Sequence, residues 1–303
     1  MEEWRSVAIT DKNTFVISKN GVICFWNTKT EVNGRVKSVP IGGGNNQFFV
    51  SIAGSSELIV ALDSNGDIWC SQLKMEYYLF KMDQYNNICA IYIFKNQFYA
   101  LDEEGYLWVG DFYGNKRLEN PKLPPIFSCS INELRCAIDI DGNVLCWKSS
   151  SCIPYKIKVP FQRAIYIHST EDYLLMIGNN GKLWKFNYND KKVIPMYHNI
   201  PIPLVKIFSS EQHTIILDEE GSAWSWGNNG ALGLKYYNHP FPCLVSDMPP
   251  IHSAFCTSSK TLVLSYHGEL FKWKNTNSVI IKGIPVISIP RSTAKSARSR
   301  IES

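Results

Sequence analysis

Short apolar segments alternate with polar turns along almost the whole chain. Seven segments of this kind each precede a turn that contains glycine, and they read FVI, IVAL, FYAL, CAI, LLMI, IIL and LVL. Runs rich in β-branched and aromatic residues, bounded by Gly, Asp, Asn or Ser, are typical of strands. The pattern therefore predicts an all-β protein built from short antiparallel strands.

Seven glycines set the period of this pattern, at intervals of 37 to 47 residues. They are Gly21, Gly66, Gly105, Gly142, Gly181, Gly221 and Gly268. Eight of the nine tryptophans follow one of these glycines by three or five positions. Because side chains an even number of positions apart share one face of a strand, we expect all these rings on the same face.

The unit is most complete between Pro203 and Met248, where PLVKIF, HTIIL, SAWSWG and CLVSDM are predicted as four strands. The polar turn SSEQ joins the first two, and Asp218 to Gly221 forms a turn with Asp first and Gly fourth, as type I geometry favours. Four antiparallel strands repeated seven times predict a seven-bladed β-propeller of four-stranded antiparallel blades over residues 1–290. The tryptophans would then pack between adjacent blades.

One more strand-like segment, Pro285 to Ile289, follows the seventh unit. Propellers commonly close by building one blade from both chain ends, which removes a free sheet edge. Either this segment or the N-terminal SVAIT takes that place, and the sequence leaves both alternatives open.

The net charge of +4 is concentrated in residues 291–303, which hold four basic side chains and one acid. The nearly neutral body gives no electrostatic footprint for nucleic acid. Residues 291–303 are predicted to be a disordered basic tail. It is a nuclear-import segment, a segment that contacts nucleic acid or chromatin, a contact to an anionic membrane, or a solvated terminus. No apolar run is long enough for a membrane helix, and the N-terminus does not resemble a signal peptide. We expect an intracellular monomer, cytoplasmic or nuclear.

The candidate chemistry is sparse. Nine cysteines form no C-x-x-C pair and no Cys/His cluster with metal spacing, so no metal site is predicted. Cys24, Cys70 and Cys146 lie in the tryptophan-bearing strands and are expected to be buried free thiols. Residues 41–45 lack the Lys-Ser/Thr of a P-loop, and no serine nucleophile elbow occurs. We therefore expect no intrinsic catalysis and no cofactor.

The stretch HTIILDEEGSAWSWGNNGALGL resembles a repeat of the regulator of chromosome condensation family. The matching positions are His213, Thr214, Gly221, Trp224, Trp226, Gly227, Gly230, Leu232 and Gly233. The other six units share only the hairpin glycine, an aromatic residue and the apolar framing.

The founding member of that family is a nucleotide-exchange factor for the small GTPase Ran and docks on nucleosomes. Relatives are binding modules in ubiquitin ligases, ciliary proteins, bacterial effectors and a lactamase inhibitor. The resemblance implies a scaffold for protein–protein interaction, with guanine-nucleotide exchange on a Ran-type GTPase as one function. A non-catalytic module that binds a substrate or cargo is the alternative, and fold alone does not choose between them.

In the exchange factor, acidic and histidine side chains between the first and second strands face the GTPase. The resemblance therefore implies a partner-binding set consisting of Asp11, Glu57, Glu133, Asp172, Glu211 and His213. Two simpler interpretations stand beside it. The repeat histidine commonly ties its loop to a neighbouring strand, and a loop residue such as Asp172 is often only solvated. The units also lack the extended insertion that the exchange factor uses on its GTPase, which favours the alternative.

Overall fold

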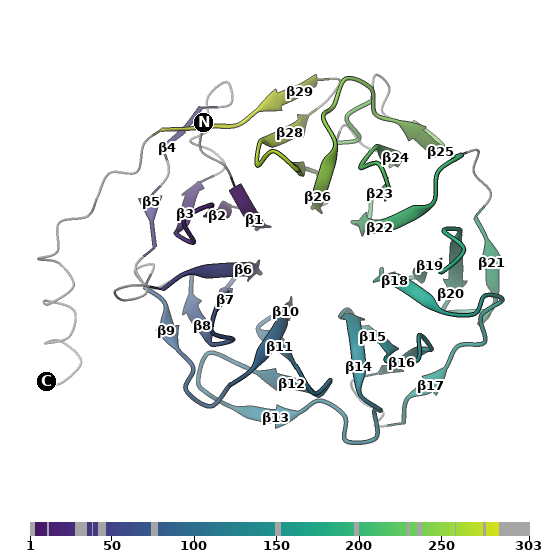
Figure 1. Ribbon diagram of the computed structural model, residues 1–303, viewed down its shortest axis with the longest axis horizontal. Helices are drawn as coiled ribbons and strands as arrows, with labels where there is room; N and C mark the ends of the chain where they lie inside the picture. The colour runs from purple at the N-terminus through teal and green to yellow at the C-terminus, as the bar shows by residue number, and fades with distance from the viewer. Residues whose placement is uncertain are drawn as a thin grey trace, which may run out of the picture.

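The chain forms a closed ring of blades around a central opening, as its computed structural model shows (Figure 1). The structure describes residues 4–10, 12–27, 35–37, 39–41, 47–73, 78–148, 153–196, 200–228, 231–234, 238–257, 259–274 and 277–284. Seven four-stranded antiparallel sheets follow one another around the ring, and every regular element within those ranges is a strand. The predicted seven-bladed, all-β propeller is confirmed.

Each blade is a meander whose strands follow one another outward from the opening. Blade 1 contains β1 (Trp4–Ile9), β2 (Asn13–Ser18), β3 (Ile23–Asn27) and β5 (Val39–Pro40); blade 2 contains β6 (Phe49–Gly54), β7 (Leu58–Asp63), β8 (Ile68–Gln72) and β9 (Phe80–Lys81). Blade 3 contains β10 (Ile88–Phe94), β11 (Gln97–Asp102), β12 (Leu107–Gly110) and β13 (Lys116–Leu118); blade 4 contains β14 (Ile126–Ser130), β15 (Leu134–Asp139), β16 (Val144–Lys148) and β17 (Tyr155–Lys156).

The second half of the ring repeats this order. Blade 5 contains β18 (Ala164–Ser169), β19 (Tyr173–Gly178), β20 (Leu183–Asn187) and β21 (Val193–Pro195); blade 6 contains β22 (Leu204–Ser209), β23 (His213–Asp218), β24 (Ala223–Asn228) and β25 (Asn238–Leu244). Blade 7 contains β26 (Ile251–Cys256), β27 (Thr261–Ser265), β28 (Leu270–Lys274) and β29 (Asn277–Ile280). The outer strand of blade 6 differs from the predicted CLVSDM, because pairing with β24 begins at Asn238 and ends at Leu244.

The ring closes between blade 7 and blade 1. The N-terminal segment forms β1, the inner strand of blade 1, and each blade is made of strands that follow one another in sequence. Outside the blades, β30 (Lys282–Ile284) pairs in parallel with β4 (Arg35–Lys37). Residues 285–303, with the extra strand-like segment and the basic tail of the sequence analysis, lie outside the described residues.

The hydrophobic core is divided among the seven contacts between neighbouring blades, with one cluster at each contact. All eight tryptophans of the repeating pattern lie in these clusters, each against the preceding blade; they are Trp26, Trp69, Trp108, Trp147, Trp184, Trp224, Trp226 and Trp273. Twisted sheets leave a wedge of space between them, and large rings fill it. The predicted packing of tryptophans between blades is confirmed.

The hairpin glycines join consecutive blades. Each adopts a left-handed conformation, for example φ of +78° at Gly66 and +79° at Gly221. The carbonyl of Gly66 accepts a bond from Ile88 N (3.2 Å), and that of Gly221 accepts one from Ile251 N (2.8 Å). A Cβ on Gly221 would lie 3.1 Å from Ile251 N and O, so glycine satisfies both the conformation and the close approach.

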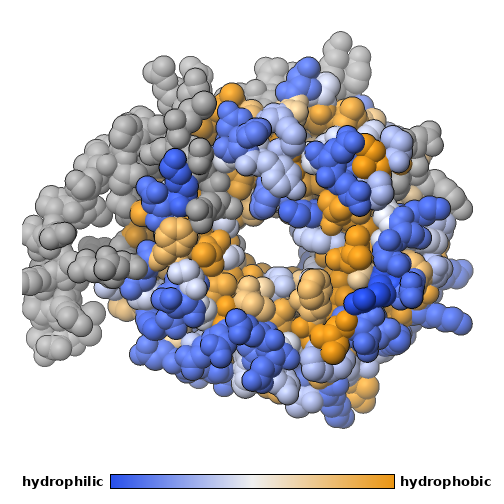
Figure 2. Space-filling model, viewed as in Figure 1, coloured by the Kyte–Doolittle hydropathy of each residue, from blue (hydrophilic) through white to orange (hydrophobic). Residues whose placement is uncertain are grey.

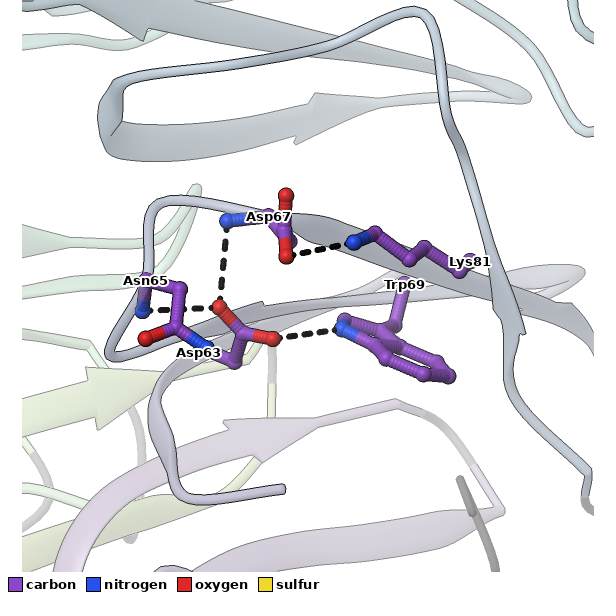
Figure 3. A network of polar contacts seen from close by, with 5 residues as sticks. All are labelled: Asp63, Asn65, Asp67, Trp69 and Lys81. Atoms are coloured by element: carbon purple, nitrogen blue, oxygen red, sulfur yellow. Dashed lines mark hydrogen bonds and ion pairs between the residues drawn. The ribbon is translucent and has the colours of Figure 1, made fainter. Parts of the chain in front are cut away.

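An aspartate at the start of the hairpin accepts two turn N–H bonds in four blades, including Asp139 in blade 4, and in three of them it also accepts a bond from a tryptophan. In blade 2, Asp63 Oδ1 accepts bonds from Asn65 N and Asp67 N, and Oδ2 accepts one from Trp69 Nε1 (2.8 Å), as Figure 3 shows. Lys81 on the outer strand forms an ion pair with Asp67 (2.7 Å). The same three bonds recur around Asp102 with Trp108 and around Asp218 with Trp224.

A buried ion pair lies between blades 3 and 4. Arg135 Nε is 2.7 Å from Glu119 Oε1, and both side chains are almost fully buried. The guanidinium also donates to the Tyr99 hydroxyl, and Trp147 Nε1 donates to Glu119 (3.1 Å). Buried charges of this kind require such partners, because an unpaired charge inside a protein is costly.

One expectation about the cysteines is wrong. Cys24 and Cys70 are buried free thiols, as predicted, but Cys146 forms a disulfide with Cys136. The two residues lie directly opposite each other on β15 and β16, with 4.2 Å between their Cα atoms. The register of the hairpin brings these two cysteines together without any C-x-x-C motif.

Candidate partner-binding face

The propeller has two unlike faces. Because the strands of each blade are antiparallel, the turns between first and second strands all lie at one end, here called the first-turn face. The hairpins between second and third strands lie at the other end, here called the hairpin face. Five of the six residues predicted to bind a partner belong to the turns and strand starts of the first-turn face: Glu57, Glu133, Asp172, Glu211 and His213.

The first turns are held by their own hydrogen bonds. In four blades a hydroxyl at the start of the turn accepts a bond from the backbone N–H three residues later; these hydroxyls belong to Thr10, Ser55, Thr170 and Ser210. The carbonyl of Asp172 accepts a further bond from Tyr188 N, at the end of the third strand of the same blade. Glu57 and Gln212 carbonyls do the same in blades 2 and 6. These bonds fix the turns, so side chains on them are presented from a rigid base.

The structure brings acidic side chains onto consecutive blades of this face. Glu133 lies on blade 4, Glu171 and Asp172 on blade 5, and Glu211 on blade 6, and all four are exposed. We call them the acidic sector. Glu57 is also exposed, but it lies on blade 2 and apart from them. Asp11 lies outside the described residues.

One member of the acidic sector, Glu133, forms an ion pair with a described cation, and a lysine lies over the ring of Tyr173 beside another member. Lys95 of blade 3 forms an ion pair with Glu133, and this contact lowers the pKa of the Glu133 carboxyl. Both partners are exposed, so the pair contributes little to stability. Lys185 lies over the Tyr173 ring, 4.0 Å from its centre, directly after Asp172 in the turn.

His213 occupies a different environment from the acids. Its side chain is 2% exposed, with Nδ1 2.9 Å from Ser210 Oγ and Nε2 2.6 Å from Thr261 Oγ1 of blade 7. Burial lowers the pKa of His213 to about 4, so the ring is neutral at physiological pH. The histidine ties its own turn to the neighbouring blade, and a partner on this face would meet Glu211 instead.

His168 makes a comparable tie between blades 5 and 6. Its Nε2 donates to the carbonyl of Ser209 across a distance of 3.2 Å. Burial lowers the pKa of His168 to about 4. Sequence reasoning did not identify this histidine, because it lies on an inner strand, outside the repeat motif that draws attention to His213.

Metal sites, membrane-spanning helices and cavities are the remaining features to consider among the described residues. They bring together no group of three or more His, Cys, Asp or Glu side chains that could hold a metal ion. They also include no helix long and apolar enough to cross a membrane. The cavity lined by Trp184, Met196 and Pro203 has a volume of about 470 Å³, and Lys182 is the one charged side chain of its lining.

Comparison with known proteins supports the repeat resemblance at one place. The regulator of chromosome condensation (RCC1) repeat matches residues 204–231, which form most of blade 6. The predicted resemblance is confirmed for this blade. No curated protein matches the sequence.

Solved structures share the fold at low sequence identity. Human WBSCR16 is 11% identical, with a TM-score of 0.69 and coverage of 87% of both chains. PorZ, of the Porphyromonas gingivalis type-IX secretion system, is 11% identical with a TM-score of 0.70; the match covers 95% of this chain and 39% of PorZ. The WD40 propeller of Doa1 is 13% identical, with a TM-score of 0.61 and coverage of 96% and 94%. The chain is thus a seven-bladed propeller that contains a regulator-of-chromosome-condensation repeat.

Proposed function

We propose that this propeller is a scaffold that binds a protein partner through the acidic sector of its first-turn face. The observation that carries the proposal is the set of exposed carboxylates on three consecutive blades, presented by turns that are fixed by hydrogen bonds. Surface charges of one sign steer association and select partners of the opposite sign. A partner with a basic surface fits this face best.

A small GTPase is the first partner to test, with nucleotide exchange as the finer form of the proposal. The repeat at residues 204–231 supports this choice, and Glu211 lies within that repeat. Exchange by such a surface needs no covalent chemistry, because it acts on the contacts between the GTPase, Mg²⁺ and the phosphates. A non-catalytic module that binds a substrate or cargo is the alternative, and the missing insertion favours it.

Release of labelled GDP tests the exchange form. We expect micromolar protein to accelerate release from a Ran-type or Rab-type GTPase, and the variant Glu171→Gln/Asp172→Asn/Glu211→Gln to lose that acceleration. The matched control is Glu103→Gln/Glu104→Gln/Glu219→Gln, which removes three carboxylates from the hairpin face and should leave the rate unchanged. Absence of acceleration by the unmodified protein would exclude exchange on these GTPases.

Binding without acceleration supports the alternative. The protein acts as a binding module if a GTPase binds it, loses this binding to the acidic-sector variant, and still releases GDP at its intrinsic rate. If both triple variants bind as the unmodified protein does, the acidic sector is not the binding surface.

A further inference from the structure

Every inner strand has a β-bulge at the same place, near the end that lies on the hairpin face. The register of pairing shifts around one residue in each of the seven inner strands. These bulged residues are Arg5, Val50, Cys89, Phe127, Ile165, Val205 and His252. A bulge leaves its extra residue unpaired and re-aims its side chain. Because the inner strands border the central opening, the bulges form a ring at its mouth on the hairpin face (Figure 1).

Five bulged residues are apolar, and several of these are exposed. Phe127 is 68% exposed, Ile165 40% and Val50 39%, and Cys89 is exposed as well. Ile140, at the hairpin of blade 4, is 60% exposed. Val50, Cys89, Phe127, Ile140 and Ile165 together are called the mouth patch.

The mouth patch extends over blades 2 to 5, and two of its members, Phe127 and Ile140, belong to the same strand pair of blade 4. Ile126 on β14 pairs with Asp139 on β15, and Phe127 and Ile140 are the residues that directly follow these two in the chain. Ile140 N also donates to the carbonyl of Pro125 (3.2 Å), beside the start of that inner strand. Apolar residues border the central opening beside β10, β14 and β18 in Figure 2.

The hairpin turns around the opening carry mainly negative charge. Their described residues include seven carboxylates: Asp67, Glu103, Glu104, Asp141, Glu219, Glu220 and Glu269. They include two lysines, Lys19 and Lys182, and Asp67 is already paired with Lys81. Arg163 lies at the edge of the mouth patch and donates to the Ile140 carbonyl (3.1 Å). On blades 2 to 5, which carry the mouth patch, the carboxylates that are not paired with Lys81 are Glu103, Glu104 and Asp141, and they outnumber the cations Lys182 and Arg163.

Contiguous exposed apolar patches mark interaction sites, whereas single exposed apolar side chains do not. The negative charge around the patch favours one class of ligand. A basic segment is attracted by the carboxylates, and an acidic segment is repelled. Phe127 and Ile140 are more exposed than the patch residues Ile165 and Val50, so they suit contact with an anchor side chain of the partner, because binding energy concentrates in a few side chains that an interface buries.

We propose that the mouth patch binds an extended segment of a partner protein, with a large apolar side chain seated over the central opening and Lys or Arg on either side of it. This surface lies on the opposite face from the acidic sector. One propeller would then engage two partners at once, each on its own face.

Selection from a phage-displayed library of random twelve-residue peptides tests the proposal on the full chain. We expect enriched peptides to combine Phe, Leu, Ile or Trp with flanking Lys or Arg. Their affinity should fall at least tenfold for Phe127→Ser/Ile140→Ser. Both side chains are exposed, so this variant should keep the thermal unfolding midpoint of the unmodified protein.

Two controls complete the experiment. Tyr113→Ser removes another exposed aromatic ring, from the first-turn side of blade 3, and should leave peptide affinity unchanged. The variant Glu103→Gln/Glu104→Gln/Asp141→Asn should weaken binding several-fold and reduce its dependence on salt. The proposal is overturned if no basic apolar peptides are enriched, or if the enriched peptides bind Phe127→Ser/Ile140→Ser as tightly as the unmodified protein.

Discussion

Blades 5 and 6 adopt the same meander with different polar contacts. In blade 6, Asp218 accepts a bond from Trp224 Nε1 (3.0 Å), and His213 reaches across to blade 7. Blade 5 has Gly178 in place of the aspartate, and Trp184 Nε1 is buried without a hydrogen-bond partner. A ring from Phe161 instead lies where the Cβ of residue 178 would be.

The features that the two blades share are the hairpin glycine and its bond to the next blade. Gly181 and Gly221 both have positive φ, and their carbonyls accept bonds from Leu204 N (3.1 Å) and Ile251 N (2.8 Å). The glycine and the apolar contacts between blades are therefore the common framework of the fold. Asp218 and His213 stabilise blade 6, whereas blade 5 has other residues at the corresponding positions.

The largest predicted effect is the loss of a hairpin glycine. Gly181→Val and Gly221→Val should each lower the free energy of unfolding by about 3 kcal/mol, because a β-branched residue is strained at positive φ and its Cβ would meet the next blade. Chemical denaturation measures this, with Ser222→Ala as the control. Equal losses in the two blades support a common framework, whereas an unchanged free energy in either variant would contradict it.

Removing the buried histidine of blade 6 should have the next largest effect. His213→Ala leaves Ser210 and Thr261 without their ring partner and opens a cavity, which together cost about 2 kcal/mol. Tyr173→Ala, at the corresponding position of blade 5, should cost less because Tyr173 is only half-buried. Thermal unfolding of both variants would show the difference; an equal loss would mean that the bond to Thr261 adds nothing.

Asp218→Ala should cost about 1–2 kcal/mol, since it leaves two turn N–H groups and Trp224 Nε1 without their acceptor. The matched variant in blade 5 is Phe161→Ala, which removes the ring that fills the corresponding space. Unfolding in urea compares the two. If Asp218→Ala is as stable as the unmodified protein, the bond to the tryptophan is not a stabilising feature of the hairpin.

Most of the fold was predictable because its period is carried by residues with a single structural role. Gly66 and its equivalents are required by positive φ, and the tryptophans by the wedge between blades, so both mark the blades in the sequence. The disulfide was not predictable in the same way, since Cys136 and Cys146 become neighbours only through the register of β15 and β16. Likewise, the acidic sector depends on which blades are adjacent.

Some sequence patterns can be interpreted only once the contacts in the structure are known. Aspartate at the first hairpin position coincides with tryptophan six residues later in blades 2, 3 and 6, and there the two side chains are bonded. The mouth patch depends on the bulges of four inner strands, on blades 2 to 5, and no local sequence pattern indicates these bulges. The placement of His213 inside the protein follows from Thr261, which is 48 positions away in the sequence.

Stability should also fall as the pH decreases from about 6.5 to about 4. Burial lowers the folded-state pKa of His213 to about 4, below the usual value of 6.5, so the unfolded state binds a proton first. The stabilisation is present above pH 6.5 and is lost towards pH 4, at up to about 1.4 kcal/mol per pH unit for one group. His213→Asn should reduce this slope between pH 6 and 4.5. An unchanged slope would mean that the ring is protonated in the folded protein.

The exposed carboxylates of blades 5 and 6 should contribute to binding of a partner and not to the stability of the fold. Because Glu171, Asp172 and Glu211 are exposed, neutralising them should change the free energy of unfolding by less than about 0.5 kcal/mol. The most direct test measures the affinity of a GDP-loaded Ran-type GTPase for the unmodified protein and for Glu171→Gln/Asp172→Asn/Glu211→Gln by biolayer interferometry. We predict binding by the unmodified protein and at least tenfold weaker binding by the variant, at an unchanged unfolding midpoint. Equal affinity for the two proteins would contradict the assignment of the acidic sector as the partner-binding surface.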